Sequence, residues 1–420
     1  MSTAQTTAKR PGHFKKREFG LFTHRNAQII KLLTGANIEP TEKHYDDYAR
    51  MCWEGDPLAD AVVEWFRTVS FVKGRAMIEQ ALDHGIETLD NPPQCLIDLF
   101  AQIDKDPFWL DRELVAEGAR AIHRSGPLGL FVLGDIALMG GYAISSVMNK
   151  SLVFTGALED GAYGRLAETG KWWMDVTAEG GLDRFGKGTR TTVLVRIMHA
   201  MVRMRLRSHP DWDFEELGMP ISQAHMLSTN MAFAVLFIQM TNLLGVRYSK
   251  RERKAMMHLW RYAGMLSGID EAYNFESEVE GLRVLWLSAT SQPPADEDAI
   301  ALAHALLNVS PLDGVGGRYE QRLKDAVIGL RLGLTQLGGP GMLRELELPE
   351  DKAWRWSPLA IRAGMGALEL GRAVVPGGKK IQARLGRNLL EAMQNAKPRD
   401  TAKFKPVDDL KHDVEKMAAE

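Results

Sequence analysis

Apolar residues recur at helical spacing along almost the whole chain, whereas patterns typical of β-strands are nearly absent. No run of alternating β-branched and polar residues is long enough to build a sheet. Two long segments, residues 194–206 and 226–244, are apolar around most of their circumference. Such segments are typical of helices inside a protein core. We therefore predict an all-α fold.

The helical pattern lies between two polar ends. We expect residues 1–20 to form a disordered arm, residues 21–396 a single all-α domain, and residues 397–420 a polar C-terminal tail. No repeat of fixed period divides the chain. A domain of this length is large enough to enclose a cofactor pocket.

Charge and cysteine content exclude several classes of protein. The 52 Lys and Arg residues nearly balance the 54 Asp and Glu residues, so no strong field attracts nucleic acid. Two cysteines are too few for a zinc cluster or a disulfide framework. The polar start also lacks the apolar core of a secretory signal. We therefore expect a cytoplasmic protein.

Two segments bear on membrane contact. Residues 127–148 are long enough to span a bilayer and carry one charge, Asp135. No basic flank marks an orientation, so a buried helix is favoured. Residues 381–396 are amphipathic and include Arg384 and Arg387. Such a helix could rest on a membrane surface, although it more often packs on its own domain, so peripheral membrane contact stays open.

Several common catalytic motifs are absent from the sequence. Residues 181–187 have the spacing of a phosphate-binding loop, but Gly188 stands where its Ser or Thr should be. No histidine has Glu three residues before it, as a di-iron bundle requires. Neither a His-Glu-x-x-His zinc helix nor a Cys-x-x-Cys-His haem attachment site occurs. A non-covalent cofactor held by one histidine remains possible.

The segment 188–207 contains such a histidine. Thr192, Arg196, His199 and Arg203 fall within one sector about 60° wide on a helix. An imidazole in an apolar pocket is a good axial ligand for haem iron, and arginines can pair with the haem propionates. The alternative is an ordinary core histidine whose hydrogen bonds are satisfied, beside surface arginines.

The segment 155–182 places a polar trio on one helix face beside Trp172. Glu168, Thr169 and Trp172 lie three, four and seven positions after Arg165, so all four side chains share one helix face. The pattern suggests a pocket wall. An ordinary amphipathic helix with its charges in water is the alternative.

Together these segments resemble the rubber oxygenase family, which includes the bacterial latex-clearing proteins and the fungal oxygenases of mycophenolic acid biosynthesis. The resemblance covers about residues 60–350 and rests on the order and spacing of short motifs. They are Thr155-Gly156, Arg165-Leu-x-x-Thr169, Gly180-Gly181, Arg196-x-x-His199-Ala200, and Gly218-x-Pro220-Ile221-x-Gln223 followed by Thr229 and Phe233.

The resemblance implies an all-α fold with a globin-like core that encloses one non-covalent b-type haem. His199 would be the proximal iron ligand, Arg196 would help to hold the haem, and Arg165 and Thr169 would lie on the distal-side helix. Known members of the family cleave isoprenoid double bonds with dioxygen.

The sequence departs from the rubber-cleaving members at three points. Glu168 stands where they carry a distal lysine, Asn149 stands where their catalytic glutamate is expected, and their export signal is not found. These differences count against cleavage of an extracellular polymer.

We therefore expect a haem-b-dependent oxygenase that uses dioxygen on a small apolar, isoprenoid or lipid-like, unsaturated substrate. Its pocket would be walled by residues 127–148 and 226–244 with Trp172 and Trp173. Glu168, Thr169 and Arg165 are the candidate catalytic residues, and His199, Arg196, Arg165 and Arg203 are the candidate haem-binding residues. Glu168 could take an allylic proton or bind ferric iron.

Three questions stay open at this point. Glu168 could instead pair with Arg165 or Lys171 at helical spacing. The protein could be a haem-binding sensor or carrier without turnover, or an α-helical lipid-binding protein without haem. The oligomeric state is not readable from the sequence.

Overall fold

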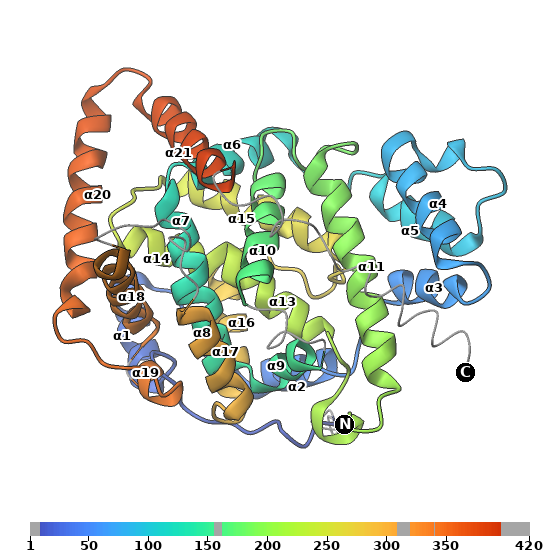
Figure 1. Ribbon diagram of the computed structural model, residues 1–420, viewed down its shortest axis with the longest axis horizontal. Helices are drawn as coiled ribbons and strands as arrows, with labels where there is room; N and C mark the ends of the chain where they lie inside the picture. The colour runs from blue at the N-terminus through green and yellow to red at the C-terminus, as the bar shows by residue number, and fades with distance from the viewer. Residues whose placement is uncertain (1–8, 155–161, 309–319, 340, 396–420) are drawn as a thin grey trace, which may run out of the picture.

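The computed structural model describes residues 9–154, 162–308, 320–339 and 341–395, and these residues form an all-α protein (Figure 1). Within these ranges there is no β-strand, and the one β-bridge joins Phe19 to Phe22. The all-α prediction is confirmed, whereas the globin-like arrangement of its core stays a prediction.

The helices follow one another with short connections. The α-helices are α1 His24–Thr34, α2 Glu42–Met51, α3 Pro57–Phe66, α4 Phe71–His84, α5 Gln94–Ile103, α6 Arg112–His123, α7 Pro127–Phe131, α8 Met139–Ile144, α9 Ser146–Val153, α10 Ala162–Val176, α11 Lys187–Arg207, α12 Phe214–Leu217, α13 Gln223–Met231, α14 Phe237–Leu243, α15 Lys250–Leu266, α16 Glu278–Thr290, α17 Glu297–Leu307, α18 Glu320–Thr335, α19 Met342–Glu345, α20 Ser357–Val374 and α21 Gly378–Asn395. Shorter helical turns are η1 Ile86–Thr88, η2 Val132–Leu138, η3 Ala232–Leu236, η4 Gln336–Gly338 and η5 Trp354–Trp356.

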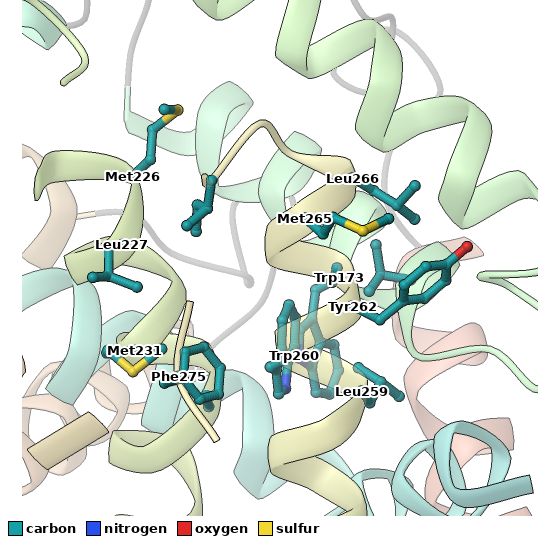
Figure 2. Packing of buried hydrophobic residues seen from close by; sticks show 14 of the residues in the cluster. Trp173, Met226, Leu227, Met231, Leu259, Trp260, Tyr262, Met265, Leu266 and Phe275 are labelled. Carbon is teal, nitrogen blue, oxygen red and sulfur yellow. The ribbon is translucent and has the colours of Figure 1, made fainter. Parts of the chain in front are cut away.

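The core is built around α15, which begins at a capping box. The Ser249 hydroxyl accepts from the backbone N–H of Glu252, and the Glu252 carboxylate accepts from the N–H of Ser249. Figure 2 shows the apolar side chains that α15 and α13 bring together, among them Trp260, Tyr262 and Met231. The sequence from Ser249 onward therefore encodes both the start of the helix and its buried face.

Glycine lets the helices approach α6 closely. A Cβ on Gly118 of α6 would lie 2.4 Å from the carbonyl oxygen of Ala255 on α15. A Cβ on Gly386 of α21 would lie 2.0 Å from the carbonyl oxygen of His123 at the end of α6. Real Cβ atoms do not come this close, so α6 can lie against both helices only because these positions lack side chains.

Two long apolar helices cross the interior, and each contains a π-helical turn. One runs through α7, η2 and α8 (Pro127–Ile144), and the other through α13, η3 and α14 (Gln223–Leu243). Both are long and apolar enough to span a membrane, but most of each window is buried inside the protein. In the first helix Asp135 accepts a hydrogen bond of 2.6 Å from buried Arg331. These features favour the buried helix that the sequence indicated over a membrane span.

The described part of the expected N-terminal arm is ordered. Residues 9–20, which we expected to be disordered, pack on the domain: the backbone N–H of Gly12 donates to the carbonyl of Glu215, and Phe14 and Phe19 are buried. Two buried phenylalanines and backbone hydrogen bonds to residues 215, 216, 290 and 291 anchor this segment. The predicted polar tail, residues 397–420, lies outside the described residues.

Candidate functional site

Helix α11 carries the predicted histidine and spans Lys187–Arg207, as the sequence indicated. A compact loop, residues 177–186, joins it to α10, and the N–H of Thr189 donates to the carbonyl of Gly181 in this loop. A Cβ on Gly186 would lie 2.5 Å from that same carbonyl oxygen. The glycines that imitate a phosphate-binding loop therefore serve a close turn between two helices.

Arg196 is engaged in a buried ion pair. Its Nε and Nη2 donate to the two carboxylate oxygens of Asp56 at 2.6 and 2.8 Å, and its Nη1 donates to Gln102 at 2.8 Å. Asp56 also caps the first turn of α3. Because carboxylate and amide already satisfy this guanidinium, its place in the structure is to tie α11 to α3 and α5, and not to offer a free charge to a cofactor.

Arg203, two turns further along α11, is equally buried but differently placed. None of its three guanidinium nitrogens makes a hydrogen bond, and its one ion pair joins Nε to Oδ1 of partly exposed Asp60 at 3.4 Å. Its side chain is 2% exposed. Burial lowers the pKa of this guanidinium below its usual value. A buried arginine without hydrogen bonds is costly unless an anionic group completes it.

His199 lies one turn before Arg203. Its Nδ1 atom is buried and has no hydrogen-bond partner, while the residue as a whole is only partly buried. Burial, with the nearby charge of Arg203, lowers the pKa of His199 to about 4, so the ring is neutral at pH 7. The structure therefore does not show the satisfied core histidine that the sequence left open. A neutral imidazole is the form that binds iron.

The site holds one histidine and no cluster of protein ligands. Among the described residues no group of three or more His, Cys, Asp or Glu side chains could hold a metal ion. A metal at His199 would therefore arrive with most of its own ligands, as haem iron does. The unsatisfied nitrogens of His199 and Arg203 fit the iron and a carboxylate of such a group.

Helix α10 lies against α11, and it carries the predicted polar trio. The indole Nε1 of Trp172 donates to the hydroxyl of Thr192 at 3.0 Å, which fixes the two helices together. Glu168 is partly buried, whereas Thr169 is exposed. The side chain of Arg165 lies outside the described residues. Lys171, one of the alternative partners of Glu168, pairs with Asp175 at 2.6 Å.

A cavity of about 280 Å³ opens beside α10 and α11. Its lining is mostly apolar, with charged groups among it, and comes from α3, α4, α10 and α11: Phe66, Phe71, Arg75, Ile78, Ala167, Glu168, Lys171, Trp172, Asp175, Arg190, Thr191, Leu194, Val195, Ile197, Met198 and Met201. His199 is not part of this lining; it follows Met198 and so projects about 100° further round α11. Because His199 lies one turn after Val195, a lining residue, it borders the face of α11 that lines the cavity.

The predicted walls differ from those of this cavity. Neither of the two long apolar helices lines it, and Trp173 is fully buried, with its ring stacked on His123. Trp172 does line it, as predicted. Phe66 and Phe71, from the junction of α3 and α4, line it in place of the long helices.

Asn149, at the position expected for a catalytic glutamate, is fully buried on α9. Its Nδ2 donates to the carbonyl of Tyr142 at 2.9 Å. The side chain therefore holds the break between α8 and α9, and it does not line the cavity.

Sequence reasoning missed Asp56, Gln102 and Asp60, which face the arginines of α11. Asp56-Pro57 is readable as a helix start, since Asp is a common cap and Pro a common first residue. Nothing in the local pattern indicates that the cap also neutralises an arginine 140 residues away.

The part of the chain that contains α10 and α11 is similar to known proteins. A sequence model of the family described as "ER-bound oxygenase mpaB/B'/Rubber oxygenase, catalytic domain" matches residues 130–370, more than half of the chain, and this range includes α10 and α11. The rubber oxygenase of Streptomyces sp. (strain K30) is 26% identical over 362 residues, which is 81% of each chain. A solved structure of the latex clearing protein in its closed state shares the fold, with a TM-score of 0.57 and 20% identity over 82% of this chain and 90% of that one.

Proposed function

Because this chain belongs to the family of mpaB-type and rubber oxygenases and is an oxygenase, we propose that it works with a non-covalent b-type haem bound at His199 and oxidises a small apolar alkene with dioxygen. The observation that carries the proposal is on α11. One turn apart, this helix holds a buried imidazole nitrogen and a buried guanidinium, and neither makes a hydrogen bond. Burying both groups without hydrogen bonds is costly, and a cofactor that carries iron and carboxylates would give each of them a partner.

The two side chains would divide the binding of the haem between them. The neutral ring of His199 would bind the iron, and Arg203 would neutralise a propionate in the buried space beside Asp60. Arg196 contributes by holding α11 in place through Asp56. When bound, the haem supplies the activation of dioxygen.

The cavity beside Glu168 suggests what the substrate is. Aromatic and methionine side chains suit a flexible hydrocarbon, and the relative from Streptomyces is a rubber oxygenase by name. We propose a linear isoprenoid or lipid-like alkene short enough to enter this cavity. The Glu168 carboxylate, which lines it, is then placed to take an allylic proton from the substrate. The roles of Thr169 and Arg165 rest on the family resemblance.

Family membership favours turnover over the sensor or carrier interpretation, because the matched domain is described as the catalytic one. The remaining alternative is an α-helical protein that binds lipid without haem. Detection of bound haem in the purified protein would exclude it.

Visible absorption tests the haem directly. The protein purified from haem-supplemented cells should show a strong Soret band, and His199→Ala should lose it while its circular dichroism stays helical. His225→Ala is a matched control: His225, on α13, is also buried with ring nitrogens that make no hydrogen bond, and burial lowers its pKa to about 3. An equal band in wild type and His199→Ala would exclude His199 as the ligand, and no band in either would exclude a haem enzyme. Oxygen uptake with a linear isoprenoid alkene then tests turnover.

A further inference from the structure

The exposed apolar side chains of the described residues are concentrated in one small part of the molecule. Of the nineteen large hydrophobic residues that are exposed, ten lie between Trp356 and Met393: Trp356 ends η5, and the other nine are in α20, α21 and the turn that joins them. These two helices form a hairpin at the edge of the molecule (Figure 1). Such a concentration marks an interaction surface, because exposed apolar residues are ordinarily scattered.

The outward face of α20 carries no charge. All three charged side chains of this helix are bonded toward the domain: Arg362 donates to the carbonyl of Leu243, Glu369 accepts from Arg124 of α6, and Arg372 pairs with Glu369. On a helical wheel the opposite side holds Trp356, Leu359, Ala363, Ala367, Leu370 and Val374. Leu370 and Val374 are 74% and 83% exposed. This face is therefore apolar over the whole length of α20.

The charges that remain around the hairpin are basic. Residues 355–391 hold seven Lys and Arg but only two acidic residues, and both acidic groups are ion-paired, Glu369 with Arg124 and Glu391 with Arg387. Lys380 and Arg384 are exposed on α21 beside Ile381 and Leu385, and the structure shows no ion pair for either. A second copy of this chain would bring these like charges together, whereas an anionic surface would satisfy them.

We propose that the α20–α21 hairpin docks the protein on an anionic lipid surface, with the outward face of α20 in the acyl boundary and Lys380 and Arg384 among the headgroups. Apolar area and basic residues both add to binding of this kind. The proposal is independent of the haem, since no residue of the hairpin belongs to the site on α11. It gives the enzyme access to apolar molecules that are dissolved in a membrane.

Vesicle flotation tests the proposal with the full-length protein. Wild type should bind phosphatidylcholine vesicles that contain phosphatidylserine, and should bind pure phosphatidylcholine at least about tenfold less, since each basic residue contributes about 1 kcal/mol, or about fivefold. Leu370→Glu with Val374→Glu should abolish binding. Lys380→Gln with Arg384→Gln should remove most of the preference for phosphatidylserine.

Two controls separate docking from a general effect of the substitutions. Phe108→Glu with Phe185→Glu also converts two exposed apolar residues to acids, outside the hairpin, and should bind vesicles as wild type does. Circular dichroism and the melting temperature check that each variant is folded. Failure of the wild type to bind anionic vesicles would overturn the proposal. So would unchanged binding by Leu370→Glu with Val374→Glu, or gel filtration showing a wild-type dimer that this variant turns into a monomer.

Discussion

The Nε atom of Arg196 lies 2.6 Å from Oδ2 of Asp56, and both side chains are almost completely buried. The pair joins the middle of α11 to the first turn of α3. One turn further, His199 is left without a bond at Nδ1, and beyond it Arg203 makes no hydrogen bond at all. The same helix face thus contains one arginine that is fully hydrogen-bonded and one that has only an ion pair with Asp60.

Removing the charge of Asp56 should destabilise the fold. Asp56→Asn keeps the size of the side chain and its ability to cap α3, but it leaves the Arg196 charge buried and uncompensated, which costs about 3–5 kcal/mol. Urea denaturation of the haem-free protein measures the change. Asp47→Asn is the control, because Asp47 pairs with exposed Lys43, and its loss should stay within about 1 kcal/mol. Equal losses in the two variants would contradict a special role for the buried pair.

The sequence predicts these helices better than it predicts their tertiary contacts. Periodicity places His199 and Arg203 on one face of α11, because both positions depend only on helical spacing. It cannot show that Asp56 reaches Arg196, since that contact joins residues 140 positions apart. Composition likewise hides the packing of residues 9–20, where Phe14 and Phe19 outweigh the surrounding polar residues. Contacts set by tertiary packing have no local signal.

The residues of the candidate site are likewise predicted only in part. Trp172 is predicted to line a pocket, and it does. Phe66 and Phe71, which also line the cavity, come from the junction of α3 and α4. The sequence gives no reason to expect that junction beside α10 and α11. Glycine spacing was also ambiguous: Gly181 and Gly186 imitate a phosphate-binding loop, and only the structure shows that their backbones meet in a turn.

Arg203 should contribute to haem binding and not to the stability of the haem-free chain. Arg203→Met keeps an unbranched side chain and removes a buried charge without hydrogen bonds, but it also breaks the ion pair with partly exposed Asp60, so the free energy of unfolding should change by no more than about 1 kcal/mol. Haem affinity should fall about tenfold or more, because a charge-assisted pair with a propionate is lost. Urea denaturation without haem and a haem titration give the two values. A large loss of stability without haem would mean that the protein itself satisfies this arginine.

Buried His123 should make stability depend on pH. Burial, helped by the charge of Arg387, lowers the pKa of His123 to about 4, below its ordinary value of about 6.5. Between these values the unfolded chain binds a proton that the folded chain does not, so stability falls as the pH falls from about 6.5 to about 4. His123→Phe keeps a ring against Trp173 and should lower the slope of unfolding free energy against pH by about 1.4 kcal/mol per unit.

Unfolding free energies of wild type and His123→Phe between about pH 4.5 and 6.5, roughly the window between the two pKa values, measure this slope. Above about pH 7 the two proteins should differ by a constant amount, which reports the lost hydrogen bond of 2.9 Å between His123 and Thr177. Parallel curves throughout the acid range would show that His123 does not carry the effect.

Glu168 is the residue whose replacement should separate turnover from haem binding. Glu168→Gln keeps the shape of a side chain that lines the cavity and removes the carboxylate proposed to accept a proton, so kcat should fall by about 100-fold or more. The Soret band and the melting temperature should stay as in wild type, because His199 does not line this cavity. Asp175→Asn is the matched control: it makes the same chemical change in the same lining at a carboxylate with no proposed role in proton transfer, and the oxygen uptake of this variant should change little. Equal activities of Glu168→Gln and wild type would remove Glu168 from the mechanism, whereas a shifted haem spectrum would show that it approaches the iron.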